Sequence, residues 1–485
     1  MLAREPISWF PPWAAPLPLV NRPLRGERAG SEWSCERPSD HDWPRIAEGL
    51  RAANAALRAM PIAEIIRCID EVAERWSLAS FPPRLAARAA VVRATGFSPE
   101  AVDLSFDAEL RNYRAEALWR TLRRELGDPR MLDGFVPDSE LRGSVRAFGP
   151  RITLVVCTGN VPGLPALPFV RALLAKSCII AKVASGEPSF ARQFAASLHA
   201  LEPRLSAAMV VTYWERSETQ TLKAVLAHTD AVMAYGSDEA CSQLRAMVPP
   251  GQRFVEHGHK LSVGLLTRAY LAQSGVQETA ARVARDASMF NQHACIAPQA
   301  YFVEGSPSEQ AAFAEAVAAA LRSFAKTCPL GDLEPRDAAC LQLSRAEQAF
   351  RAAAGQERAL WRDDDLQWTV TLEPALGAPR GQGHRYLRLI GVDDPEAAVE
   401  MLRPWGSHLQ NVALGANSAE ALTLANTLAE LGATRLCDPG RMADPSMMWR
   451  HDGRTCIAEL LRFCDVEHAP ALSRTLSQTA EKEPA

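Results

Sequence analysis

Four short β-rich runs, each followed by a helical stretch, constrain this chain most. They are RITLVVC (151–157), SCIIAKV (177–183), AAMVVTY (207–213) and DAVMAY (230–235). Strands that alternate with helices form βαβ units, in which the strands run parallel and the helices cover both faces of the sheet. The pattern therefore predicts a doubly wound α/β domain, whose ligands bind beyond the carboxyl ends of the strands.

A helical region precedes these strands. From Asp42 to Leu126 apolar residues recur at three- and four-residue spacing, and Pro61, Pro82 and Gly96 mark the breaks. A second α/β section follows, with a helix that ends near Phe290 and an alanine-rich helix to about Ala325. Its predicted strands are 299–305, 368–372, 385–392 and 409–415, with a helix over 419–431 before TRLCD.

The length of 485 residues exceeds what one hydrophobic core supports, so two or three domains are expected. The predicted ranges are an N-terminal arm (1–45), a helical preface with a cofactor-binding domain (46–262), a catalytic domain (263–435) and a C-terminal return segment with a charged, disordered tail (436–485).

Composition excludes several function classes. Lys and Arg total 53 against 57 Asp and Glu, so no nucleic-acid partner is expected. The eleven cysteines form no CxxC pair and indicate a reducing cytoplasm. The proline-broken N-terminus is unlike a signal peptide and is predicted to be a lid or packing arm. No stretch of eighteen apolar residues lacks a charge, so no membrane span is expected.

The turn after the first of the four strands is the first candidate site. The dinucleotide signature GxGxxG and the phosphate-binding GxxxxGK[ST] are both absent. In CTGNVPG, however, Asn160 lies at the carboxyl edge of the sheet, and Thr158 of the same turn is a candidate cofactor contact. The alternative is an ordinary turn, in which Gly, Asn and Pro are common.

The next strand ends supply two more candidates. Lys182 would extend a cation toward the same edge, or lie along the surface as an exposed lysine. Gly236 and Ser237 open a helix whose N–H groups could bind a pyrophosphate, although Ser237 could equally be only a helix N-cap.

Cys295 lies in a loop beside polar Asn291, Gln292 and His293 rather than in an apolar run. A thiolate is strongly nucleophilic near neutral pH, although a single cysteine is more often inert. His257 with His259, and His293 with Cys295, also form HxH and HxC pairs. No closed set of four zinc ligands exists, so no metal is predicted.

The order of these motifs resembles the aldehyde dehydrogenase superfamily, nearest to the LuxC-type long-chain acyl-CoA reductases, over about residues 45 to 455. The resemblance implies that Cys295 is the nucleophile, that Asn160, followed by Pro162, supplies an oxyanion-hole amide, and that Lys182 contacts the adenosine ribose. It also maps the turn that packs on the pyrophosphate onto Gly236, Ser237 and Glu239, and the Glu-x-Gly-x-Lys segment onto Glu256, Gly258 and Lys260.

LuxC-like character is carried by QHACIAPQ, HGHKLSV and RLCDPGRMADPSMMWRHDGR. One departure is that the superfamily's Glu-x-Phe-Gly-Pro segment, which grips the nicotinamide ribose, has no counterpart between Tyr386 and Asp394. A second is Ser185, which stands where NAD-preferring members often carry Glu. Loss of that negative charge beside Lys182 favours a phosphorylated ribose, and therefore NADPH.

The resulting prediction is NADPH-dependent reduction of an acyl thioester, either acyl-CoA or an acyl-carrier thioester, to an aldehyde through Cys295. One alternative is an aldehyde-oxidising dehydrogenase, in which Glu256 activates water. Another is an acyl-transfer subunit without redox activity. The resemblance also implies a homo-oligomer and an acyl-protein synthetase as a partner.

Overall fold

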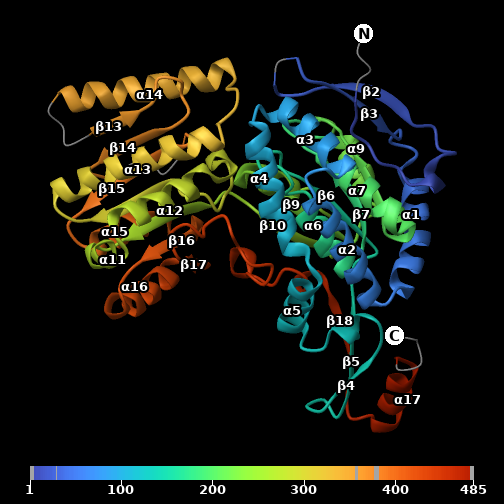
Figure 1. The fold of residues 1–485 in the computed structure, drawn as a ribbon. Helices are drawn as coiled ribbons and strands as arrows, with labels where there is room; N and C mark the ends of the chain where they lie inside the picture. Colours follow the sequence, from blue (N-terminus) through green and yellow to red (C-terminus); the bar gives the residue numbers. More distant parts are fainter. Residues whose placement is uncertain (1–4, 29, 355–358, 376–381, 481–485) are drawn as a thin grey trace. The chain divides into compact units, whose positions relative to one another are not determined.

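The computed structural model describes residues 5–28, 30–354, 359–375 and 382–480. The chain divides into two compact units (Figure 1). Unit 1 comprises Met1–Ala94, Glu109–Gly258 and Ser446–Ala485, and unit 2 comprises Thr95–Ala108 and His259–Pro445. The predicted tail falls partly on 481–485, which lie outside the described residues.

The central sheet of unit 1 has five strands in the order β10-β9-β6-β7-β8, all parallel. Their bounds are β6 Ile152–Val156, β7 Cys178–Lys182, β8 Met209–Thr212, β9 Ala231–Tyr235 and β10 Arg253–His257. The four predicted strands and their parallel arrangement are confirmed, and β10 is an addition. From β6 the chain first forms β7 and β8 on one side of it and then β9 and β10 on the other. The direction of the connections therefore reverses beside β6, and the switch point of the sheet lies at the carboxyl end of this strand.

Helices connect the strands of this sheet. They are α6 Ala166–Leu174, α7 Phe190–Leu201, α8 Pro203–Ala207, α9 Thr219–Leu226 and α10 Asp238–Arg245. All residues of β8 and β9 are buried, as expected for parallel strands covered on both faces.

The predicted helical region is confirmed as five helices, α1 Trp43–Ala59, α2 Ile62–Ser77, α3 Pro82–Thr95, α4 Pro99–Leu110 and α5 Ala115–Leu126. Gly96 takes a φ of +75°, which ends α3 where other residues would be strained. Residues 95–108 of this helical region belong to unit 2. The reason is local pairing, because the Asp332 N–H donates to the Gly96 carbonyl and Phe97 bridges Gly331.

The N-terminal arm forms a three-stranded sheet of order β1-β3-β2, with β1 Glu5–Pro6, β2 Val20–Arg25 and β3 Glu32–Arg37. Trp9 and Val211 exchange two backbone hydrogen bonds of 2.9 Å, so the arm packs along the edge of β8. Its turn between β2 and β3 carries Glu27.

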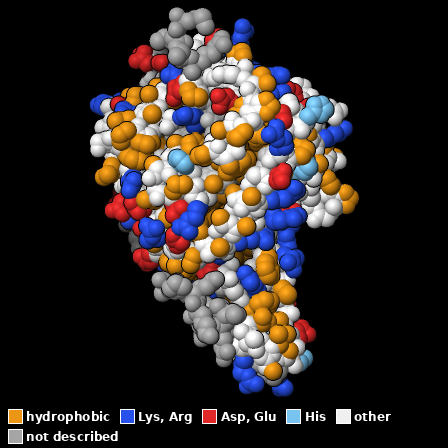
Figure 2. Space-filling model, turned by 90° about the vertical axis from the view of Figure 1, so that its right-hand side faces the viewer, with side chains coloured by type: hydrophobic (Ala, Val, Ile, Leu, Met, Phe, Trp, Pro, Cys, Tyr) orange, Lys and Arg blue, Asp and Glu red, His pale blue; other side chains and the backbone are white. Residues whose placement is uncertain are grey.

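A third sheet of unit 1 has the order β18-β5-β4, with β4 Val136–Asp138, β5 Gly143–Phe148 and β18 Arg462–Val466. Strand β18 and helix α17 (Pro470–Ala480) come from the C-terminal return segment. Phe463 of β18 and Leu472 of α17 are exposed. Figure 2 shows hydrophobic side chains on the surface of this part of unit 1, at the lower end of the view.

Unit 2 contains a seven-stranded sheet of order β13-β14-β15-β12-β11-β16-β17, in which only the β13–β14 pair is antiparallel. The bounds are β11 Leu261–Leu266, β12 Ala300–Glu304, β13 Ala359–Arg362, β14 Thr369–Glu373, β15 Tyr386–Val392, β16 Leu409–Gly415 and β17 Arg435–Cys437. The second predicted α/β section is confirmed.

Two apolar clusters cover this sheet. One includes residues of α11 Arg268–Ser274, α12 Val276–Ser288 and α13 Pro307–Thr327, and the other includes residues of α15 Pro395–Leu402 and α16 Ser418–Leu431. Helix α14 spans Pro335–Ala353. In the described part of the chain, no helix is both long enough and apolar enough to cross a membrane.

Candidate functional site

The turn after β6 presents Asn160 at the switch point of the unit 1 sheet. The Thr158 hydroxyl donates to Asn160 Oδ1 over 2.6 Å, which orients the exposed carboxamide. A Cβ on Gly159 would lie 2.7 Å from the Glu187 backbone nitrogen, so only glycine fits this close approach. Thr158 and Asn160 therefore form a small, internally bonded turn at the predicted place.

Lys182 ends β7 and is half-buried. Its ammonium lies 5.0 Å from the ring centre of Tyr213 and 5.8 Å from that of Trp214. Burial lowers the pKa of Lys182, and the Cys157 thiol opposes that shift. The lysine thus packs on two rings at the strand edge and is not an exposed surface side chain.

Ser185 corrects one premise of the sequence analysis. Its hydroxyl donates to Oε1 of Glu27 over 2.7 Å, and a Cβ on Gly186 would lie 3.1 Å from Oε2 of the same carboxylate. The sequence around Ser185 indicates the loss of a negative charge. The structure shows that the N-terminal arm brings a negative charge to this position.

Ser237 is a helix N-cap, the less specific of its two predicted roles. Its hydroxyl oxygen accepts from the Ala240 N–H over 3.2 Å at the start of α10, directly after Gly236. The first turn of α10 also carries Asp238 and Glu239, which stabilise a helix N-terminus but repel an anion there.

Glu256 lies on β10 with its carboxylate half-exposed. Oε1 is 3.2 Å from Nη2 of Arg245, and the Glu256 carbonyl accepts a hydrogen bond from Arg454. One of the two carboxylate oxygens is therefore paired with a guanidinium.

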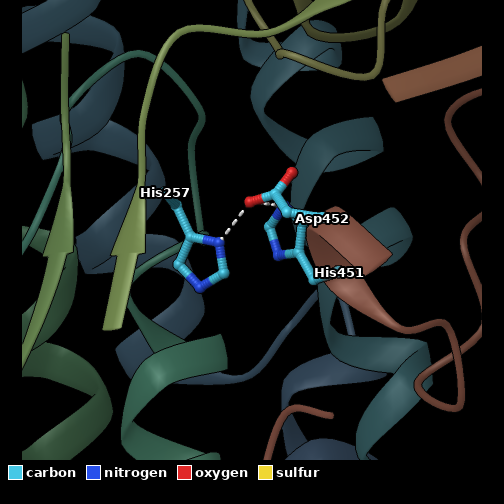
Figure 3. Close-up of side chains that lie close together, drawn as sticks. All are labelled: His257, His451 and Asp452. Atoms are coloured by element: carbon cyan, nitrogen blue, oxygen red, sulfur yellow. Dashed lines mark hydrogen bonds and ion pairs between the residues drawn. The ribbon is translucent and has the colours of Figure 1, made fainter. Parts of the chain in front are cut away.

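Beside Glu256, the side chain of His257 on β10 lies close to those of His451 and Asp452 in the return segment (Figure 3). His257 Nδ1 lies 2.7 Å from Asp452 Oδ2, and its ring stacks on Tyr235 at 4.5 Å and on His451 at 4.2 Å. The two histidine planes differ by only 23°, and Nδ1 of His257 is already bonded to the Asp452 carboxylate. The arrangement fits a buried anchor between β10 and the return segment better than a metal centre.

The sequence analysis missed His451 and Asp452. The available signal was RHDGR late in the chain, but its pairing with His257 spans 195 residues. His259, the second histidine of the HxH sequence, is not part of this cluster. His259 belongs to unit 2, where its ring lies 6.2 Å from His408.

Cys295 is exposed on the loop between α12 and β12 of unit 2. The preceding residues Phe290, Asn291 and Gln292 all take positive φ values, of 53°, 48° and 66°. A run of three non-glycine residues in this region is strained, and such strain persists only where the surroundings enforce it. The loop before the thiol is therefore held in an unusual conformation.

Three side chains donate hydrogen bonds to backbone carbonyls of this loop. Ser262 donates to the Cys295 carbonyl over 2.6 Å, and Asn411 donates to the Ile296 carbonyl over 3.0 Å. Gln292 donates to the Pro298 carbonyl over 2.7 Å. These bonds fix the backbone at Cys295 and over the residues that follow it.

Arg385 is a buried cation that the sequence analysis missed. It is 1% exposed, donates to Asn291 Oδ1 over 3.1 and 2.9 Å, and donates to the Cys328 carbonyl over 2.7 Å. The His384 N–H also donates to the Asn291 carbonyl. The strained turn and the start of β15 are thus bonded together.

His293 is neutral in this environment. Burial lowers its pKa to about 3, and its Nε2 lies 3.3 Å from Nδ1 of His384. A neutral imidazole carries no positive charge, so His293 adds none to the loop that carries Cys295.

The model of the family described as acyl-CoA reductase (LuxC) matches residues 57–463. This chain belongs to the LuxC family. The predicted resemblance to the LuxC family is confirmed by the family model and by relatives, and the predicted fold is confirmed by solved structures.

Two relatives of this LuxC-family chain are long-chain acyl-protein thioester reductases. The protein of Aliivibrio fischeri is 24% identical over 422 residues, which is 86% of this chain and 84% of that one. The protein of Photorhabdus luminescens is 25% identical over 410 residues, which is 83% of this chain and 82% of that one.

Solved structures show the aldehyde dehydrogenase fold of this LuxC-family chain. Aldehyde dehydrogenase 21 of Physcomitrella patens matches with a TM-score of 0.71 at 13% identity, over 97% of this chain and 99% of that one. A benzaldehyde dehydrogenase of Corynebacterium glutamicum matches with a TM-score of 0.70 at 14% identity, over 93% and 95%.

Proposed function

We propose that this chain reduces an acyl thioester to an aldehyde with a reduced nicotinamide coenzyme, through an acyl-enzyme on Cys295. The observation that carries the proposal is the exposed Cys295 thiol on a loop with fixed backbone. The family description and the names of the relatives support the same reaction class.

The Cys295 thiolate attacks the thioester carbonyl carbon, a tetrahedral oxyanion forms, and the donor thiol leaves as the acyl-enzyme is made. The proposal assigns the oxyanion to the Asn160 amide and the Cys295 backbone N–H. A bound reduced nicotinamide supplies the hydride that the acyl carbon needs. Cys295 then departs as a thiolate when the aldehyde carbonyl re-forms, which restores the enzyme.

Residues of unit 1 fit the adenosine end of such a coenzyme. Lys182 and the Ser185 hydroxyl lie at the end of β7, where a ribose needs donors and acceptors. We also assign Thr158, Gly236 and Ser237 to the coenzyme, and we expect Gly236 and Ser237 to contact an uncharged part of it, because Asp238 and Glu239 repel an anion at the start of α10. NADPH is the coenzyme that the sequence predicts, although the Glu27 carboxylate bonded to Ser185 offsets the missing charge on which that prediction rests.

The thioester donor is either acyl-CoA or an acyl group carried on a protein. The family is described as an acyl-CoA reductase, which supports acyl-CoA as the donor. The relatives are named acyl-protein thioester reductases, which supports a protein-bound acyl group. The expected homo-oligomer, the acyl-protein synthetase partner and a cytoplasmic location remain part of this proposal.

Two other functions compete with this one. Aldehyde oxidation requires Glu256 to activate water, and the Arg245 guanidinium engages that carboxylate. Acyl transfer without redox chemistry requires acylation of Cys295 without coenzyme binding. Oxidation of free aldehyde, or acylation of a protein that binds no nicotinamide, would identify one of these.

The test compares Cys295→Ser with Cys340→Ser, because both thiols are exposed. After incubation with a long-chain acyl-CoA and no coenzyme, intact-mass spectrometry should show one acyl group on the wild type and on Cys340→Ser. Cys295→Ser should carry none and should oxidise no NADH or NADPH. An acylated or active Cys295→Ser protein would remove this cysteine from its assigned role.

A further inference from the structure

Arg385 is a buried charge that the proposed chemistry does not use. It is 1% exposed, and its guanidinium lies 5.4 Å from the ring centre of Phe324. Among the described residues its hydrogen-bond acceptors are neutral groups, namely Oδ1 of Asn291, the carbonyls of Cys328 and Pro329, and the Cys328 sulfur. Burial lowers the pKa of Arg385. A buried cation held in this way is costly to retain, which indicates a role beyond packing.

The guanidinium holds the loop before the nucleophile at one residue. Nε and Nη2 of Arg385 both donate to Oδ1 of Asn291, over 3.1 and 2.9 Å. Nδ2 of Asn291 donates to the Leu330 carbonyl over 2.9 Å, and the Asn291 carbonyl accepts from the His384 N–H. Both ends of the carboxamide and the backbone are therefore held, four residues before Cys295.

Asn291 lies in the strained part of this loop. Phe290, Asn291 and Gln292 all have positive φ, so the turn would relax toward commoner conformations without contacts that oppose this. Hydrogen bonds to the Cys295 and Ile296 carbonyls fix the loop after the turn. The directions of the Cys295 sulfur and N–H therefore depend on the geometry that the turn keeps at its start.

We propose that Arg385 is a positioning residue for acyl transfer to Cys295 and acts through Asn291. The inference rests on the proposed function, in which Cys295 supplies both the attacking sulfur and a backbone N–H for the oxyanion. Both groups must face one carbonyl, and a misplacement of about 1 Å costs about 10²-fold in rate. Arg385 bonds to the turn and to residues 328–329, so its effect on the reacting groups is indirect.

The test measures how fast a long-chain acyl-CoA acylates the full chain in a single turnover without coenzyme, by intact-mass spectrometry. Arg385→Met removes every hydrogen bond of the guanidinium, and Arg385→Lys keeps the charge without the planar fork. Arg385→Met should be acylated about tenfold more slowly or worse at saturating acyl-CoA, and Arg385→Lys should lie between it and the wild type. The acyl-CoA concentration that gives half the maximal rate should change little.

Arg345→Met is the matched control. Arg345 is a second buried arginine of unit 2, and in the described part of the chain it donates to Thr369, Asp363 and the Trp368 carbonyl. This variant loses a buried cation but should be acylated at the wild-type rate. Alkylation of Cys295 by iodoacetamide needs a thiolate but no oxyanion donor, so its rate should stay near that of the wild type in every variant.

A double variant separates positioning from general weakening of the fold. Because Arg385 acts through Asn291, Arg385→Met combined with Asn291→Ala should be acylated no more slowly than the slower single variant. Slowing by Arg345→Met to the same extent, effects that multiply in the double variant, or wild-type acylation of Arg385→Met would each overturn the inference.

Folding of the variants is checked by circular dichroism. If only Arg385→Met fails to fold, slower acylation of Arg385→Lys supports the inference and wild-type acylation overturns it. Failure of both variants to fold would make Arg385 a structural residue and would also overturn it. Failure of the proposed function has a different signature, because the wild type itself would then form no acyl-enzyme on Cys295, and the inference would fall with it.

Discussion

Asn291 joins a strained backbone to a buried charge. Its φ and ψ of 48° and 32° lie in the left-handed region, and its side chain accepts both short bonds from Arg385. Asparagine tolerates this conformation better than other residues with a Cβ because its short polar side chain bonds locally. Asn291 therefore accepts two hydrogen bonds of a buried guanidinium and sets the direction of the loop that leads to Cys295.

Substitutions at Asn291 should separate these two roles. Asn291→Ala should lower the free energy of unfolding by about 3 kcal/mol, because the buried Arg385 loses one of its acceptors and the Leu330 carbonyl loses its donor. Asn291→Gly removes the same hydrogen-bond acceptor, but glycine adopts a positive φ without strain. This variant should therefore be about 1 kcal/mol more stable than Asn291→Ala. Urea unfolding of both variants measures the difference. Equal stabilities would show that the backbone strain is not significant.

At the scale of elements, the end of β10 is fixed by the return segment. Asp452 binds His257, and His451 packs between the rings of His257 and Trp449. Burial lowers the pKa of His257, although the Asp452 bond opposes the shift, and burial lowers the pKa of His451 well below its ordinary value. Both histidines are therefore neutral in the folded protein.

This anchor should make the protein sensitive to acid. The unfolded chain binds more protons than the folded one once the pH falls below the ordinary histidine pKa of about 6.5, so stability should fall as the pH decreases from there. His451→Phe keeps an aromatic ring for stacking and removes one group that binds a proton only in the unfolded chain. Its loss of melting temperature between pH 7.5 and 5.5 should be smaller than that of the wild type.

The exposed His41 gives the matched control, because His41→Gln removes a histidine that unit 1 does not bury. His41→Gln should follow the wild-type dependence on pH. A His451→Phe variant with that same dependence would show that the anchor does not cause the acid sensitivity.

At the scale of the whole molecule, three separate stretches of sequence make up unit 1. The last stretch is tied down by β18, which pairs with β5, and by Glu125 of α5. The Glu125 carboxylate accepts from the N–H groups of Cys456, Ile457 and Ala458 over 2.8 to 2.9 Å. Chain segments far apart in sequence therefore stabilise one another within this unit.

Glu125→Ala should loosen unit 1 without affecting unit 2. Three N–H groups lose a charged acceptor, which should cost about 2 to 3 kcal/mol. Hydrogen exchange followed by mass spectrometry should then show faster exchange over 456–458 and β18. Peptides from β11, β12 and β16 should exchange as in the wild type, and Glu125→Gln should have an intermediate effect. Faster exchange throughout the chain would mean that the two units unfold together.

The sequence alone determined the elements and the family. Apolar spacing and the breaks at Pro61, Pro82 and Gly96 predicted the helices, and β-rich runs predicted the strands, because both depend on residues close in sequence. The order of motifs from Asn160 to Cys295 indicated the superfamily. The roles of these residues stay predictions.

Tertiary structure alone decided which distant side chains meet. Glu27 binds Ser185 across 158 residues, Asn291 binds Arg385 across 94, and His257 binds Asp452 across 195. No local pattern encodes such pairs, because each exists only after packing of the sheets has compensated the entropy of closing a long loop. For this reason the sequence could indicate a missing charge at Ser185, and only the fold could show that the arm supplies it.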